Sequence, residues 1–173
     1  VIIRSAENAM NDYMNKILKN AEPNDYVIGV DTDSVYLNLN ELLEKIADGD
    51  KITNVTDLVN TICEKNIQAE LNRVMTELAT KLLCTKNKII FKREAIASVG
   101  MFVAKKRYAL LLDDLEGVRF AEPKLKIMGL EAVKSSTPLI VRTRLKDAIK
   151  IILTKNEGAL KKFVEAFKTE FMQ

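Results

Sequence analysis

The stretch YVIGVDTDSVYLNL at residues 26–39 is the part of the sequence that is most informative about the fold. Residues 26–30 are a short apolar run with β-branched members, and residues 35–39 alternate between apolar and polar side chains. Both patterns are typical of strands, whereas DTDS at residues 31–34 consists of residues that favour turns. The stretch therefore predicts two antiparallel strands joined by an acidic turn.

Helices are predicted on both sides of this hairpin. Apolar residues recur at steps of three and four within residues 1–18, which predicts an amphipathic helix that ends at a turn over residues 20–25. A short helix over residues 41–47 and a loop over residues 49–53 follow the hairpin. The helical spacing then extends from residue 56 to about residue 83 and predicts a long helix.

A region rich in strands comes next, around a turn signal at residues 113–117. We expect strands over residues 89–91, 95–103 and 106–112, and a hairpin partner over residues 118–121. This region lies between helices on both sides and supplies the strands for a sheet.

Two further helices are predicted at the C-terminal end. Thr137 is expected as an N-cap and Pro138 at the first helical position of a helix that runs to about residue 153. Residues 156–158 separate it from a last amphipathic helix through residue 171. Strands in the middle of the chain with helices around them predict an α+β fold.

The composition excludes several classes of protein. The chain has 173 residues, 47% hydrophobic and 29% charged, which is enough for one domain with a sizeable core. Because it has no histidine, catalytic sites that need imidazole are excluded. Cys63 and Cys84 alone support neither a zinc site nor a disulfide framework. No apolar run approaches the roughly 20 residues that span a bilayer, so we expect a soluble intracellular chain with no membrane partner.

The charges are distributed unevenly along the chain. Residues 1–80 contain 7 basic and 14 acidic residues, a net charge of −7, whereas residues 81–173 contain 20 basic and 10 acidic residues, a net charge of +10. Residues 81–110 have eight basic residues against the single acid Glu94. Such an imbalance favours a polyanionic partner, although a solvated surface gives the same pattern.

Two carboxylates at the predicted acidic turn are candidates for chemistry. Asp31 and Asp33 lie two residues apart, so both can point into one pocket. Carboxylate oxygens suit hard divalent cations, and a pair of such ions supports phosphoryl transfer without a histidine. The structural alternative is that DTDS forms a turn and nothing more.

A haloacid-dehalogenase-type phosphatase is another interpretation of the same residues. The string resembles the Asp-x-Asp-x-Thr/Val pattern of that class, with Asp31 as nucleophile, Asp33 as acid or base, and Asp113 and Asp114 as a later acidic pair. In that fold the strand leads to a helix of a parallel sheet, whereas residues 35–39 have the pattern of a return strand. We therefore rank this interpretation second.

Four blocks of sequence, in order, resemble the family B DNA polymerases. DTDS at residues 31–34 with its flanking strands resembles motif C, and KKRY at residues 105–108 resembles the KKxY motif. KREAIA at residues 92–97, and RFAEPKLKIMGLE at residues 119–131 with KSSTP at residues 134–138, are similar to the T4-like phage branch. The blocks cover about two thirds of the chain, which makes them specific together.

The resemblance implies a domain arrangement and a catalytic site. Residues 1–130 would be the C-terminal part of a palm with an antiparallel sheet and packed helices, and residues 131–173 the start of a thumb. Asp31 and Asp33 would be metal ligands, and Glu94 a catalytic carboxylate that tunes the site. The cofactors would be two Mg²⁺ ions, and the reaction the template-directed transfer of a deoxynucleotide from its triphosphate to a primer 3′ end.

The resemblance also implies contacts with primer-template DNA. Lys105, Lys106, Arg107 and Tyr108 match residues that hold the primer-template, with Lys106 reaching the minor groove beside the new base pair. A second set would approach backbone phosphate near the predicted helix N-terminus. This set is Lys134, Ser135, Ser136 and Thr137. The structural alternatives for the first set are a solvated edge strand and sheet packing of the tyrosine ring.

Several features depart from the family pattern. Gly29 and Val30 precede Asp31, where the family usually has Tyr-Gly. Residues 1–26 offer no candidate for the motif A aspartate, and the fingers and exonuclease parts have no counterpart. We therefore expect a piece of a longer or naturally split polymerase, completed by a segment with these parts and inactive alone. A sliding clamp would be a further partner, and the cytoplasm of a bacterial or phage-infected cell the location.

A non-catalytic DNA-binding module is the alternative from a different functional class. Such a protein would keep the basic, DNA-binding face of a polymerase but would not synthesise DNA. Reconstitution with the missing segment separates the two, because only a polymerase would regain synthesis that Asp33→Ala abolishes.

Overall fold

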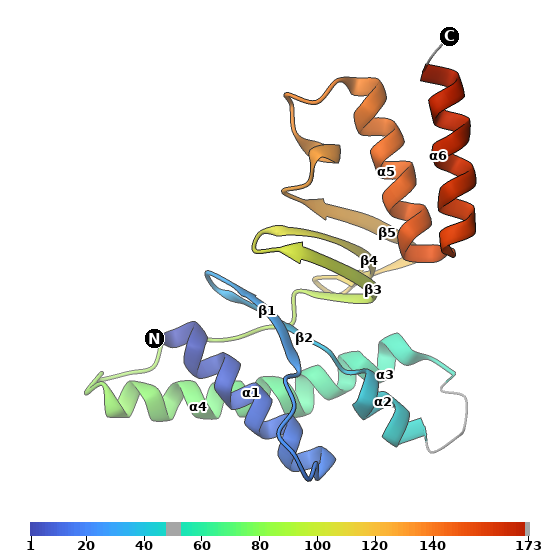
Figure 1. The fold of residues 1–173 in the computed structure, drawn as a ribbon. Helices are drawn as coiled ribbons and strands as arrows, with labels where there is room; N and C mark the ends of the chain where they lie inside the picture. Colours follow the sequence, from blue (N-terminus) through green and yellow to red (C-terminus); the bar gives the residue numbers. More distant parts are fainter. Residues whose placement is uncertain (48–52, 172–173) are drawn as a thin grey trace. The chain divides into compact units, whose positions relative to one another are not determined.

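The computed structural model describes residues 1–47 and 53–171 and divides into two compact units, Val1–Glu94 and Ala95–Gln173 (Figure 1). Each unit combines helices with an antiparallel sheet, so the predicted α+β class is confirmed. The loop predicted over residues 49–53 falls almost entirely outside the described residues. No helix in the described ranges is long and apolar enough to cross a membrane.

The first unit is mainly helical and carries the hairpin predicted from residues 26–39. Strand β1 (Val27–Asp31) pairs antiparallel with β2 (Ser34–Leu37). The helices are α1 (Ile2–Leu18), α2 (Asn40–Ala47), α3 (Val55–Ile62) and α4 (Gln68–Lys81). The hairpin and the helices predicted over residues 1–18 and 41–47 are therefore confirmed.

Helix α1 anchors the hairpin through its apolar face. Its buried residues recur every four positions, which places them on one side of the helix. They are Ala6, Met10, Met14 and Leu18. Met10 shares a core cluster with Leu71 and Met75 of α4, and hairpin side chains such as Val35 pack against this cluster. Full burial of such a side chain contributes about 1.5–3 kcal/mol to the free energy of unfolding. The core that α1 and α4 share therefore holds the hairpin against these helices.

The long helix predicted over residues 56–83 is present but interrupted. Helix α3 passes into a π-helical turn, η1 (Cys63–Ile67), which leads directly into α4. The spacing of apolar residues does not reveal such a turn, because a π turn keeps the helix continuous and changes only its bonding to i→i+5. Burial raises the pKa of the Cys63 thiol, which therefore stays protonated at neutral pH.

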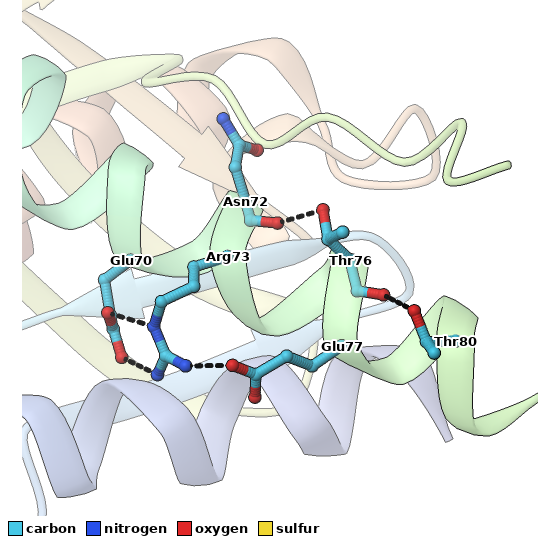
Figure 2. A network of polar contacts seen from close by, with 6 residues as sticks. All are labelled: Glu70, Asn72, Arg73, Thr76, Glu77 and Thr80. Atoms are coloured by element: carbon cyan, nitrogen blue, oxygen red, sulfur yellow. Dashed lines mark hydrogen bonds and ion pairs between the residues drawn. The ribbon is translucent and has the colours of Figure 1, made fainter.

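Helix α4 also carries a network of polar contacts (Figure 2). Arg73 donates to both carboxylate oxygens of Glu70, at 2.6 and 2.9 Å, and to the carboxylate of Glu77. The Thr76 hydroxyl donates to the carbonyl oxygen of Asn72 at 2.8 Å. Residues three and four apart are neighbours on a helix, so these contacts connect successive turns of α4 along its surface.

The strand predicted over residues 89–91 is wrong. The backbone N–H of Ile89 donates to the Asn87 side chain at 2.9 Å, and that of Phe91 donates to Oδ1 of Asn72 at 3.4 Å. The side chains of Ile89 and Phe91 pack against the core cluster that α1 and α4 share. The segment is apolar because it covers this core, and these N–H groups bind side chains instead of a neighbouring strand.

The second unit is built on a three-stranded antiparallel sheet with the order β3-β4-β5. Its elements are β3 (Ala95–Ala104), β4 (Arg107–Leu115), β5 (Val118–Met128), the short 3-10 helix η2 (Glu131–Val133), α5 (Leu139–Thr154) and α6 (Glu157–Phe171). Its core joins the sheet to α5 and contains Ala109, Leu111, Leu130, Ala132, Ile149 and Leu153. The strand predicted over residues 95–103 and the last two helices are confirmed.

The turn predicted over residues 113–117 is shorter than expected. Glu116 and Gly117 alone form it, both with positive φ (52° and 85°), so β4 and β5 are longer than predicted. The carboxylate of Asp114 accepts a hydrogen bond from the Gly117 N–H at 3.0 Å and lies 3.4 Å from Nε of Arg119. These partners allow the aspartate to remain buried within a strand.

Helix α5 begins one residue later than predicted. Pro138 occupies the N-cap position with an extended backbone (ψ 146°), and no side chain caps the helix, so the predicted N-cap Thr137 is wrong. The Thr137 N–H instead donates to the carbonyl oxygen of Lys134 at 3.2 Å. The residues before Pro138 therefore form a separate turn.

Candidate catalytic carboxylates and nucleic-acid interface

The turn between β1 and β2 fixes the positions of Asp31 and Asp33. Asp31 ends β1 and pairs with Ser34, so Thr32 and Asp33 form the turn. Thr32 has a φ of 42°, which β-branched residues rarely adopt, and its hydroxyl donates to Oδ1 of Asp31 at 3.2 Å. Strained residues persist where the surroundings impose them, and they cluster at functional sites. Thr32 is thus one of the left-handed positions of the described chain, together with Lys19, Leu83, Lys106 and Glu116.

Asp31 and Asp33 are the carboxylates that the sequence predicts to bind a cation. Asp31 is half-buried and Asp33 is exposed. Within residues 1–47 and 53–171, no group of three or more His, Cys, Asp or Glu side chains is placed to hold a metal ion. Mg²⁺ usually takes one or two carboxylates and completes its shell with water and substrate phosphates. Two carboxylates are therefore compatible with Mg²⁺, and their role as metal ligands stays a prediction.

Glu94, the third predicted catalytic carboxylate, lies at the end of the first unit. It is exposed and directly precedes β3. Among the described residues it does not join Asp31 and Asp33 in a metal-binding group. Its role in tuning the site stays a prediction.

The phosphatase interpretation does not agree with the strand arrangement. β1 turns back directly into β2, and both sheets of the described chain are antiparallel, whereas that fold needs a parallel sheet with a helix after the strand. Asp114 of the proposed later pair is buried in β4 beside Arg119. The strand arrangement therefore argues against the phosphatase interpretation.

The turn between β3 and β4 consists of Lys105 and Lys106. β3 ends at Ala104 and β4 begins at Arg107. Lys106 has a φ of 60°, again a left-handed backbone in a residue other than glycine. Its carbonyl oxygen lies 2.1 Å from the position that a Cβ on Gly129 would occupy, so this approach requires glycine. The segment after β5 is thereby packed against the lysine turn.

Glu131 connects the two sets of residues predicted to bind DNA. Nη2 of Arg107 donates to both carboxylate oxygens of Glu131 at 2.9 Å, and Nζ of Lys134 donates to Oε1 at 3.0 Å. The hydrogen bond from Lys134, the backbone N–H of Glu131 and the charge of Arg107 hold the pKa of Glu131 at about 2. Sequence reasoning missed this role of Glu131. The spacing from Lys134 was readable, but Arg107 lies 24 residues away.

The side chain of Tyr108, in β4, is almost completely buried. Its ring lies 5.5 Å from that of Phe102, centroid to centroid. The burial agrees with sheet packing as one role of this ring. Its contact with DNA stays a prediction.

Residues 134–137 form an exposed turn in front of α5. Ser135 and Ser136 are exposed, and Thr137 is half-buried. Because no side chain caps α5, the N–H groups of its first turn are available to other acceptors. Backbone N–H groups at a helix N-terminus suit phosphate, although this contact also stays a prediction.

The chain resembles known polymerases over almost its whole length. No protein-family profile matches it. It is 34% identical over 175 residues, 95% of the chain, to the DNA-directed DNA polymerase of Enterobacteria phage T4. It is also 34% identical over 161 residues, 87% of the chain, to the DNA-directed DNA polymerase of Escherichia phage RB69. It spans 19% and 18% of the length of these relatives. The predicted resemblance is therefore confirmed: the chain is similar to one segment of these phage DNA polymerases.

Proposed function

We propose that this chain is the motif C segment of a family B DNA polymerase that extends a primer by template-directed deoxynucleotidyl transfer. The observation that carries the proposal is the match of 95% of the chain to one segment of the phage T4 polymerase. Both relatives are DNA-directed DNA polymerases, and this chain spans only 19% and 18% of their lengths. The activity accordingly belongs to the complete enzyme, and the isolated segment is inactive.

The carboxylates at the β1–β2 turn would hold two Mg²⁺ ions together with ligands from the rest of the enzyme. When bound, these ions neutralise the charge that develops as the primer 3′ oxygen attacks the α-phosphate. Asp31 and Asp33 keep their carboxylates at one place because Thr32 and the pairing of Asp31 with Ser34 fix the turn. Glu94 tunes this site, and the motif A aspartate comes from the remaining segment.

The lysine turn would hold the primer-template. Lys105 and Lys106 are supported by Gly129, which lets the turn pack against the segment after β5. Minor-groove acceptors are nearly the same for every correct base pair, so Lys106 can check the geometry of a pair without reading its sequence. Arg107, Tyr108 and residues 134–137 extend this contact along the backbone. Residues 1–130 belong to the palm and residues 131–173 to the start of the thumb.

The complete enzyme needs other parts and partners. A segment with motif A and the fingers supplies the missing ligand and the deoxynucleoside triphosphate site, and another part supplies the exonuclease. A sliding clamp binds the assembled polymerase, which works in the cytoplasm of the host cell. This arrangement fits either a natural split or a longer chain.

A chimera tests the proposal. This chain replaces the matching segment of the phage T4 polymerase, and primer extension is measured with and without Asp33→Asn. We expect synthesis that Asp33→Asn abolishes, whereas Asp12→Asn on the exposed side of α1 leaves it unchanged. Synthesis that Asp33→Asn leaves at the rate of the unsubstituted chimera would contradict the proposal. A folded chimera that binds duplex but never synthesises would favour the non-catalytic module.

A further inference from the structure

Three half-exposed charged side chains form a compact cluster beside the lysine turn. Arg107 begins β4, Glu131 begins η2, and Lys134 follows η2. Their side chains are 41%, 51% and 48% exposed, respectively. The cluster therefore lies at the surface, where a large ligand can reach all three groups.

Two cations of this cluster converge on one carboxylate. The distances are 2.9 Å from Nη2 of Arg107 to each oxygen of Glu131, and 3.0 Å from Nζ of Lys134 to Oε1. Guanidinium and ammonium groups bind phosphate oxygens with the same donors and similar distances as carboxylate oxygens. The two cations therefore already form an anion position, which an acid of the same chain fills.

We propose that Glu131 occupies, in the free chain, the position that a backbone phosphate of DNA takes in the complex, and so competes with DNA for Arg107 and Lys134. The inference rests on the proposed function, which places both cations at the primer-template. Beyond that function, the inference makes Glu131 an acidic residue that weakens duplex binding until a phosphate displaces its carboxylate.

The energetics of the cluster allow such an exchange. Exposed ion pairs contribute little to stability, so exchanging a carboxylate for a phosphate costs little. Protonation does not open the cluster near neutral pH, because the contacts with Lys134 and Arg107 hold the pKa of Glu131 at about 2. A competing anion is therefore the means of releasing the two cations.

The packing of Arg107 decides the sign of the expected effect. Its Nε atom is buried, and its Cγ lies 3.3 Å from the position of a Cβ on Gly129. The stem of Arg107 therefore runs beside the Gly129 backbone, and the end of its guanidinium reaches Glu131. Removing the charge of Glu131 should free the guanidinium for phosphate without disordering it.

The test measures binding of a primer-template duplex by the full chain across a salt series. Glu131→Gln should bind roughly threefold to tenfold more tightly at low salt, with a plot of log K against log salt that is steeper by about one to two phosphate contacts. Glu165→Gln, which removes the same charge from α6, is the matched control and should change both quantities little. Adding Arg107→Ala and Lys134→Ala to Glu131→Gln should reverse the gain.

The outcomes separate this inference from the proposed function. Binding by Glu131→Gln that equals or falls below that of Glu165→Gln, with the same salt slope, overturns the role of Glu131 while leaving the interface in place. Absence of binding by the unsubstituted chain and all variants overturns the interface itself. A second readout needs no substitution: the carboxyl ¹³C signal of Glu131 should shift when duplex is added, and that of Glu165 should not. An unmoved Glu131 signal in a chain that binds duplex overturns the inference.

Discussion

Each of the two units has a two-residue turn that contains one left-handed residue, and the two turns carry side chains of opposite charge. In the first unit, a two-residue turn with a left-handed Thr32 carries Asp31 and Asp33, and in the second, a two-residue turn with a left-handed Lys106 carries the lysine pair. Residues 1–94 contain 12 basic and 15 acidic residues, whereas residues 95–173 contain 15 basic and 9 acidic residues. The comparison shows that tight turns fix both pairs of side chains, and the proposed function assigns cations to the acidic turn and phosphates to the lysine turn.

The β4–β5 turn is a two-residue turn for which no function is proposed, and its backbone can be compared with the other two. Glu116 and Gly117 both have positive φ, and glycine occupies the position with the larger value. Glycine adopts this backbone with little strain, whereas threonine and lysine do not. Glu116 nevertheless shows that a left-handed residue other than glycine also occurs at a turn with no proposed function, so the positive φ values of Thr32 and Lys106 are not specific to functional turns.

The largest effect should separate chemistry from binding. In the chimera with the phage T4 polymerase, Asp31→Asn and Asp33→Asn should each lower primer extension by about a thousandfold, because each removes a charged oxygen ligand of the catalytic ions. Duplex affinity measured without divalent cations should not fall. Equal losses of affinity and synthesis would break the division of roles between the two turns.

The next effect tests the support of the lysine turn. Gly129→Ala should lower the free energy of unfolding by about 2–4 kcal/mol, because its Cβ would meet the Lys106 carbonyl oxygen and its φ of 64° is strained for alanine. Denaturant unfolding measures the change. Gly158→Ala on α6 is the control, since its nearest contact is an ordinary 3.5 Å and its change should be small. Equal unfolding curves for the two variants would show that the close approach at Gly129 does not exist.

A smaller effect should sharpen the comparison of backbone strain. Thr32→Gly should raise the free energy of unfolding by about 0.5–1 kcal/mol, because relief of left-handed strain outweighs the added freedom of the unfolded chain. Thr32→Ala keeps the left-handed cost and should give no such gain. Denaturant unfolding of both variants measures this difference, and a loss of stability in Thr32→Gly would contradict the strained backbone.

The smallest effect concerns the pH dependence of the Arg107–Glu131–Lys134 cluster. The pKa of Glu131 is lowered to about 2, so the ion pairs are present above its ordinary value of 4.5 and are lost as the pH falls through about 2. Lys134→Ala should raise this pKa toward its ordinary value, because Lys134 is its largest cause. NMR titration of the carboxyl carbon measures both values, and an unchanged midpoint in Lys134→Ala would remove Lys134 from the cluster.

Local chemistry made most of the elements predictable from the sequence. The hairpin at residues 26–39 followed from turn residues between two strand patterns, and α1 followed from apolar residues on one face. The errors came from tertiary contacts and cross-strand partners that local composition does not show. Residues 89–91 have the composition of a strand because they cover a helical core, and Asp114 stays in a strand because Arg119 accompanies it.

The turns that carry the candidate residues were predictable from the sequence, their contacts were not, and the roles of these residues stay predictions. The sequence motifs identified Asp31 and Asp33 and the lysine pair, whereas the contact of Gly129 with Lys106 and the pairing of Arg107 with Glu131 depend on the return of β5 beside β4. No local pattern reports such approaches, because they join residues more than 20 positions apart.

The most direct test of the two-turn account is duplex binding as a function of salt by the unsubstituted chain and two double variants. Lys105→Ala with Lys106→Ala should weaken binding and make the slope of log K against log salt shallower by about one to two contacts. Lys161→Ala with Lys162→Ala on α6 removes the same charge and should have a smaller effect. Equal effects of the two variants, or binding indifferent to Lys105 and Lys106, would contradict the assignment of DNA to the lysine turn.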